Sequence, residues 1–89
     1  MNKVVTKNTV KRIRVRYYAL FREARGLSEE TFETDASTAR EVYDALRKKY
    51  HFALPQEDVR VAVNDEFAGW DDPLKAGDEL VFIPPVAGG

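Results

Sequence analysis

The residues whose types most clearly indicate a reaction are the last six of the chain, Pro84 to Gly89, with the sequence PPVAGG. The two prolines favour an extended backbone and resist folding back. Gly88 and Gly89 have no Cβ, so the chain is thin at its end and tolerates unusual dihedral angles. Six extended residues reach about 20 Å. The sequence therefore predicts a narrow tail whose terminal carboxylate can enter a tunnel in another protein.

The carbonyl carbon of Gly89 is sterically open to attack, because glycine has no side chain. ATP could activate its carboxylate as an acyl-adenylate, and a sulfur donor could then displace AMP to give a thiocarboxylate. This chemistry needs catalytic side chains only from partner enzymes. A diglycine end occurs by chance in roughly half a percent of chains, so a tag remnant or frayed end is the alternative. The preceding strand and double proline weaken that alternative.

The composition excludes several other kinds of site. The 89 residues contain no cysteine, which excludes disulfides, thiolate metal sites and a cysteine nucleophile. His51 is the single histidine, and no cluster of carboxylates has metal-ligand spacing. A chain of this length forms one small domain without room for a large enclosed active site. We therefore expect no metal and no permanently bound cofactor, and ATP would be used by an activating enzyme.

Charge is distributed unevenly along the chain. Residues 1–25 carry eight Lys or Arg and one Glu, whereas the remainder carries six Lys or Arg and fourteen Asp or Glu. A basic arm can indicate nucleic-acid binding, but Arg14 and Arg16 have the spacing of a strand's solvent face. We expect the basic and acidic segments to face each other, and no nucleic acid to bind. No apolar run approaches the ~20 residues of a membrane span, and no signal peptide is visible, so we expect no membrane partner and a cytoplasmic location.

Hydrophobic periodicity predicts the first elements. Apolar and polar residues alternate from Ile13 to Ala19, as in a strand with one buried face. A short helix at 20–26 would end at Gly26. The acidic segment 29–35 is typical of a weaker, edge strand.

The second half of the chain predicts one main helix and three more strands. Thr38-Ala-Arg-Glu41 is a capping box that opens an amphipathic helix running to Tyr50. The later strands are predicted at 59–64, 66–69 and 79–83. Together these elements predict an α+β fold, with a mixed β-sheet packed on one main helix and a flexible C-terminal diglycine tail. The expected divisions are a flexible leader at 1–11, the domain at 12–84 and the extended tail at 85–89.

The final strand predicts a partner surface, because both of its faces are apolar. Leu80 and Phe82 point to one side, and Val81 and Ile83 point to the other. A sheet with one solvated face should alternate apolar with polar residues, and contiguous exposed apolar surface commonly marks a partner site. The residues predicted to bind a partner are Tyr18, Phe67, Val81 and Ile83. The alternative is that a local loop covers Val81 or Ile83.

Several polar or aromatic residues have simpler structural explanations. His51 is expected as a charge partner at the helix end, and Trp70 as a packing residue. The acidic pair 71–72 is expected to be a solvated part of a loop. Asp78 and Glu79 either finish a turn or contact a basic surface of an activating enzyme.

The stretch from Ala62 to Gly89 closely resembles the small, sulfur-carrier subunit of molybdopterin synthase, in the MoaD/ThiS-like family of ubiquitin fold. The matching motifs are Ala62-Val63-Asn64, Pro73-Leu74, Gly77-Asp78-Glu79 and the terminus Pro84-Pro85-Val86-Ala87-Gly88-Gly89. The segment YYALFREARG is also similar to the family's opening. The likeness covers about residues 13–89, and the middle of the chain, 29–58, matches mainly in pattern.

The resemblance implies a β-grasp fold and a cycle in which this chain donates sulfur without catalytic side chains of its own. A ubiquitin-activating-like adenylyltransferase would adenylate Gly89, and a sulfur donor protein would convert it to the thiocarboxylate. The large synthase subunit, in a heterotetramer, would contact Tyr18, Phe67 and Ile83 and would receive the tail. The tail residues entering its pocket would be Pro84, Pro85, Val86, Ala87 and Gly88. Sulfur would pass to cyclic pyranopterin monophosphate, building the molybdopterin dithiolene for molybdenum cofactor biosynthesis.

Three alternatives remain open. Related carriers that serve thiamine synthesis or tRNA thiolation also end in diglycine. A ubiquitin-like protein modifier would use the same adenylate but would form an isopeptide bond to lysine. An interaction domain with a chemically inert tail would use neither reaction.

Overall fold

The structure, a computed structural model, describes residues 10–85, so the predicted leader up to residue 9 and the tail residues 86–89 lie outside the described part. The described elements occur in the order β1 (Lys11–Arg16), α1 (Ala19–Arg25), β2 (Glu29–Thr34), α2 (Ala39–Tyr50), a 3₁₀ turn η1 (Gln56–Asp58), β3 (Arg60–Val63), β4 (Glu66–Ala68) and β5 (Glu79–Ile83).

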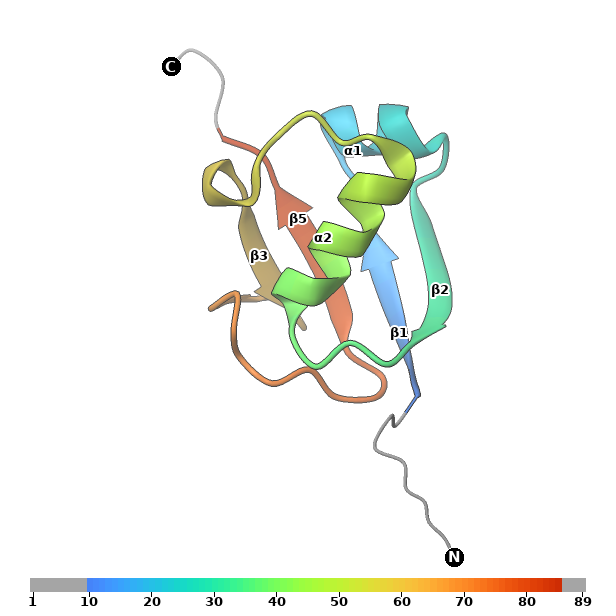
Figure 1. Cartoon of the computed structure of the whole chain (residues 1–89), viewed down its shortest axis with the longest axis vertical. Helices are drawn as coiled ribbons and strands as arrows, with labels where there is room; N and C mark the ends of the chain where they lie inside the picture. The colour runs from blue at the N-terminus through green and yellow to red at the C-terminus, as the bar shows by residue number, and fades with distance from the viewer. Residues whose placement is uncertain (1–9, 86–89) are drawn as a thin grey trace, which may run out of the picture.

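The strands of this part form one mixed sheet in the order β2-β1-β5-β3-β4. β1 is parallel to β5, and the other neighbours are antiparallel. Helix α2 lies across one face of the sheet, which we call the inner face, in front of β1 and β5 (Figure 1). The predicted α+β arrangement, a mixed sheet packed on one main helix, is confirmed.

The core lies between the inner face and α2. Leu80 and Phe82 of β5 are fully buried, and Val42 and Tyr43 of α2 are buried with them. Phe21 of α1 closes one end of the core, with its ring 5.1 Å from that of Phe52 in an edge-on arrangement. A core of this kind fixes which face of each strand points inward, because side chains alternate along a strand.

The first strand differs from its prediction at both ends. It begins at Lys11, which the sequence placed in the leader and which pairs with Thr34. It ends at Arg16 rather than at Ala19. Tyr17 is still buried, and its N–H donates to the carbonyl of Ser28 at 2.8 Å. The alternation of buried and exposed residues therefore continues past the end of β1, because the buried Tyr17 follows the last residue that pairs in the sheet.

The start of α2 carries the predicted capping box in a modified form. The Thr38 hydroxyl accepts a hydrogen bond from the Glu41 N–H, as predicted. The Glu41 carboxylate accepts from the N–H of Ser37, one residue before the cap, at 2.8 Å. His51 ends the helix as its cap, with a φ of 60° and its N–H donating to the Arg47 carbonyl.

The turns around β5 are built by side-chain hydrogen bonds. Asp78 is 8% exposed and accepts from the Asn64 side chain at 3.0 Å and from the Lys75 N–H at 2.7 Å. Asn64 in turn accepts from the N–H of Glu79 at 3.0 Å. Asp78 therefore finishes a turn, which was one of its two predicted roles. Trp70 packs on Phe82 with nearly parallel rings, as expected of a packing residue.

Candidate functional site

The two faces of β5 meet different environments. Leu80 and Phe82 point into the core, whereas Val81 and Ile83 lie on the opposite, outer face and are half-buried. In the sheet register Val81 stands between Arg16 of β1 and Ala62 of β3. Ile83 pairs with Arg60 of β3. The C-terminal end of β5 therefore presents apolar side chains away from α2.

These positions belong to a larger patch, the apolar half of the outer face, formed by Tyr18, Ala62, Phe67, Val81 and Ile83. Ala62 pairs with both Val81 and Phe67, so these three residues form one row across β5, β3 and β4. Phe67 is 68% exposed and Tyr18 is 44% exposed. Tyr18 lies under the Arg16 guanidinium, 5.8 Å from its ring centroid. The structure thus brings the four residues predicted to bind a partner to one side of the sheet.

The tail leaves from the apolar half. Pro84 and Pro85 directly follow β5, and Pro85 is exposed. With Phe67 and Ile83 they line a hollow of about 430 Å³. The remaining lining residues of this hollow are Glu57, Asp58, Val59 and Arg60. The predicted tail residues Val86, Ala87, Gly88 and Gly89 lie outside the described range.

The rest of the outer face, the charged half, consists of a ladder of ion pairs over β2, β1 and the start of β5. Its members are Arg12, Arg14 and Arg16 of β1, Glu29, Thr31 and Glu33 of β2, and Glu79 of β5.

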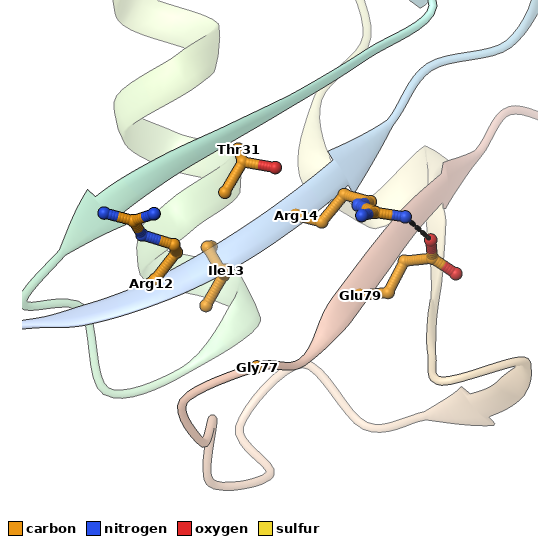
Figure 2. Close-up of a pocket in the computed structure, with 6 residues that line it drawn as sticks. All are labelled: Arg12, Ile13, Arg14, Thr31, Gly77 and Glu79. Atoms are coloured by element: carbon orange, nitrogen blue, oxygen red, sulfur yellow. Dashed lines mark ion pairs between the residues drawn. The ribbon is translucent and has the colours of Figure 1, made fainter.

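Its ion pairs cross the strands. Arg12 pairs with Glu33 at 3.2 Å, and Arg14 pairs with Glu79 at 3.6 Å, as Figure 2 shows. Arg16 lies 3.8 Å from Glu79 and 4.0 Å from Glu29. The expectation that the basic first strand faces acidic segments is confirmed.

A partly buried polar cluster that the sequence analysis missed joins α1 to β2. Arg25 holds Glu30 through two hydrogen bonds of 3.0 and 2.8 Å, and the Tyr17 hydroxyl donates to the same carboxylate at 2.6 Å. The Arg25 hydrogen bonds hold the pKa of the Glu30 carboxyl below its usual range. Burial, together with Glu30, raises the pKa of Tyr17. This cluster anchors α1 and thereby its N-terminal cap residue, Tyr18. No periodic pattern in the sequence predicts this cluster, because the cluster depends on which side chains are neighbours in the folded protein.

Arg60 is a second residue that the sequence analysis did not single out. Its guanidinium lies 5.5 Å from the ring centroid of Phe67, within the distance of a cation–π contact. The available signal was a lone arginine in the otherwise apolar run from Val59 to Val63.

Between residues 10 and 85, no three His, Cys, Asp or Glu side chains gather where they could hold a metal ion. No helix of the same range is long and apolar enough to cross a membrane.

Comparison with known proteins gives the family. Residues 15–89 match the ThiS family. The molybdopterin synthase sulfur carrier subunit of Haemophilus influenzae is 34% identical over 80 residues, covering 86% of this chain and 99% of the relative. That of Chlamydomonas reinhardtii is 38% identical over 88 residues, covering 86% and 98%.

Solved structures agree on the fold. A complex of subunits 1 and 2 of the molybdopterin-converting factor from Helicobacter pylori matches with a TM-score of 0.59 and 28% identity, over 88% of this chain and 99% of the matched chain. SAMP1 from Haloferax volcanii matches with a TM-score of 0.71 and 25% identity, over 88% and 99%. A ubiquitin from Caldiarchaeum subterraneum, 17% identical over 91% and 100%, shares the fold with a TM-score of 0.60. The predicted β-grasp, ubiquitin-like fold is confirmed, and the chain belongs to the ThiS family of sulfur-carrier proteins related to the small subunit of molybdopterin synthase.

Proposed function

We propose that this protein is the sulfur-carrier subunit of molybdopterin synthase in molybdenum cofactor biosynthesis. The observation that carries the proposal is the 34–38% identity to sulfur-carrier subunits of that enzyme over 98–99% of their length. The placement of an apolar surface at the root of a diglycine tail supports it, because a carrier must dock and extend its terminus at once.

The proposed chemistry takes place at Gly89. A ubiquitin-activating-like adenylyltransferase joins the carboxylate to AMP from ATP and releases pyrophosphate. A sulfur donor protein then supplies sulfur at the oxidation level of sulfide, which displaces AMP and leaves a thiocarboxylate. The thiocarboxylate sulfur attaches to cyclic pyranopterin monophosphate, and hydrolysis of the resulting acyl–sulfur bond leaves the sulfur on the precursor and returns the Gly89 carboxylate. Two charged carriers are needed for each dithiolene. ATP belongs to the activating enzyme, and this chain needs no permanently bound cofactor.

The proposed partner is the large synthase subunit. A relative from Helicobacter pylori is known as a complex of subunits 1 and 2, which supports a two-subunit enzyme, here a heterotetramer. Packing of the apolar half against the large subunit would remove the exposed Phe67 ring from water. It would also direct the tail from Pro84 onward into that subunit's pocket. Because activation consumes ATP, we propose the cytoplasm as the compartment.

Deletion of Gly89 tests the carrier role. In a synthase reconstituted with the large subunit, the activating enzyme, a sulfur donor and precursor, the deletion should abolish product formation. The control is Lys48→Ala on the exposed side of α2, which leaves the tail and the outer face unchanged and should retain activity. Circular dichroism should show the same fold in both variants. Product formation by the deletion variant would contradict the proposal.

A second candidate is a ubiquitin-like modifier. The likeness to SAMP1, named as a small archaeal modifier protein in another solved structure of the Haloferax volcanii protein, favours it. A modifier would leave the diglycine joined to substrate lysines, so peptide mass spectrometry of cells would find lysines carrying Gly88-Gly89. Carriers for thiamine synthesis or tRNA thiolation would be distinguished by which precursor accepts sulfur from the charged protein.

A further inference from the structure

Arg60 differs from Arg12, Arg14 and Arg16 of the outer face in its ion pairing within residues 10–85. Arg12, Arg14 and Arg16 all form ion pairs with glutamates of the charged half. Among residues 10–85, no carboxylate lies within ion-pairing distance of Arg60. Within the described residues, the arginines of the charged half are therefore paired with its own glutamates, whereas Arg60, beside the apolar half, is paired with none.

The position of Arg60 is set by the sheet. It pairs with Ile83 across β3 and β5, and its guanidinium lies over the Phe67 ring at 5.5 Å. It also lines the hollow from which Pro84 and Pro85 emerge. Glu57 and Asp58 line that hollow too, but neither reaches ion-pair distance. A partner that covers Phe67 and Ile83 must therefore also cover Arg60.

Covering this cation has opposite consequences for two kinds of partner. A purely apolar partner surface would remove water from the guanidinium without offering a hydrogen-bond acceptor or a counter-charge, which opposes binding. A partner with a carboxylate at this point would gain a charge-assisted pair of bidentate geometry in a dry setting. Discrimination between partners often depends on such a penalty for the wrong surface.

We propose that Arg60 is a specificity-determining contact, and that the docking surface of the cognate partner places an Asp or Glu carboxylate opposite it, inside a ring of apolar contacts. This inference rests on the proposed function, because the partner is taken to be the large synthase subunit. Contact with the Phe67 ring, whose centroid is 5.5 Å from the guanidinium, favours this placement of the side chain, so less side-chain freedom is lost when the pair forms.

Titration calorimetry of the full chain with the large subunit of the same organism tests the inference. Arg60→Leu should weaken binding at least about 30-fold, because it leaves the partner's carboxylate buried without a cation. Arg60→Glu should weaken it further. The control is Arg12→Leu in the charged half, which removes the same side chain from the same face and should leave the affinity unchanged.

Two further measurements separate the possible results. Replacing acidic residues on the large subunit's docking surface with Lys, one at a time, should identify one position that restores binding to Arg60→Glu. If Arg60→Leu binds as tightly as the wild type, or more tightly, Arg60 is a peripheral residue and the inference is wrong. Failure of every Lys replacement to restore binding would also overturn it. If the wild type itself does not bind the large subunit, the proposed docking fails, and this inference fails with it.

Discussion

The outer face of the sheet is divided into two halves. The side chains of the charged half form ion pairs with one another, whereas the apolar half leaves large apolar side chains exposed to water. In the charged half, the Arg14 and Glu79 side chains approach to 3.6 Å, and both remain partly exposed to solvent. In the apolar half, Phe67 is 68% exposed although it is a large aromatic residue. A surface with internal ion pairs gains little from a partner, because exposed pairs are already solvated. Exposed aromatic surface gains most from being covered.

The boundary between the two halves runs across single strands. β5 begins with Glu79, which belongs to the charged half, and ends with Ile83, which belongs to the apolar half. In β1, Arg16 pairs with Glu79 and also lies over Tyr18. The parallel alignment of β1 and β5 brings Tyr18, which follows β1, and Ile83, which ends β5, to the same end of the sheet. Because the tail starts at that end, docking and presentation of the terminus are coupled by the topology.

The largest effect is expected from Ile83→Glu. A carboxylate at this position would face Arg60 across the β3–β5 pair. There it would compete with the partner's carboxylate for the guanidinium and would replace an apolar contact of the interface, so binding should weaken at least about 100-fold. Co-purification and calorimetry with the large subunit measure it. The fold should persist, because Ile83 lies on the outer face. Unaltered affinity would show that the apolar half is not the docking surface.

The next largest effect is expected on stability, from Glu30→Gln. The pKa of Glu30 is lowered by Arg25, so its charge stabilises the fold at pH values above the unfolded pKa of about 4.3. This contribution is lost as the pH falls through the lower, folded pKa. The variant should lose about 2 kcal/mol at pH 7. Urea unfolding at pH 7 and in acid should show the difference from wild type shrinking with falling pH, and a pH-independent difference would contradict the ion-pair role.

A smaller effect is expected from Phe67→Ala. The ring is mostly exposed, so the free energy of unfolding should change little, whereas binding to the large subunit should weaken about tenfold. Thermal unfolding and calorimetry on the same samples separate the two quantities. Equal losses of stability and affinity would mean that Phe67 supports the fold rather than the interface.

The smallest effect is expected from Arg12→Leu. The pair with Glu33 is exposed on both sides, and pairs of this kind contribute about 0–1 kcal/mol. Both stability and binding should stay within that range. A binding loss comparable to that of Phe67→Ala would show that the interface extends into the charged half, and the division of the outer face would then be wrong.

The sequence predicted those features that depend on residues close together along the chain. The capping box at Thr38, the turn at Asp78 and the two-sided final strand were all visible as short patterns. The end of β1 was not, because buried Tyr17 continues the alternation after the ladder has ended.

The missed residues share a physical reason. The Arg25–Glu30 pair and the lone cation Arg60 are defined by neighbours in space, which strand register and helix placement decide. For Arg60, the informative observation is that no carboxylate lies within ion-pairing distance of it among residues 10–85. A local sequence pattern cannot predict this, because it depends on which residues are neighbours in the folded protein. Periodicity predicted the α+β arrangement and the terminal residues indicated the chemistry of Gly89, and the family resemblance added the β-grasp fold and the pathway. None of these indicated the charge arrangement around the apolar half.

The most direct measurement is the intact mass of the protein taken from cells that contain a competent activating enzyme. A thiocarboxylate at Gly89 raises the mass by the difference between sulfur and oxygen, and alkylation should then label the C-terminal peptide. Oxidation of Met1 would give a similar mass but would not alkylate at the terminus. We predict a heavier, terminally alkylated species. Only the unmodified mass, from cells in which the same enzyme charges another carrier, would contradict the sulfur-carrier function.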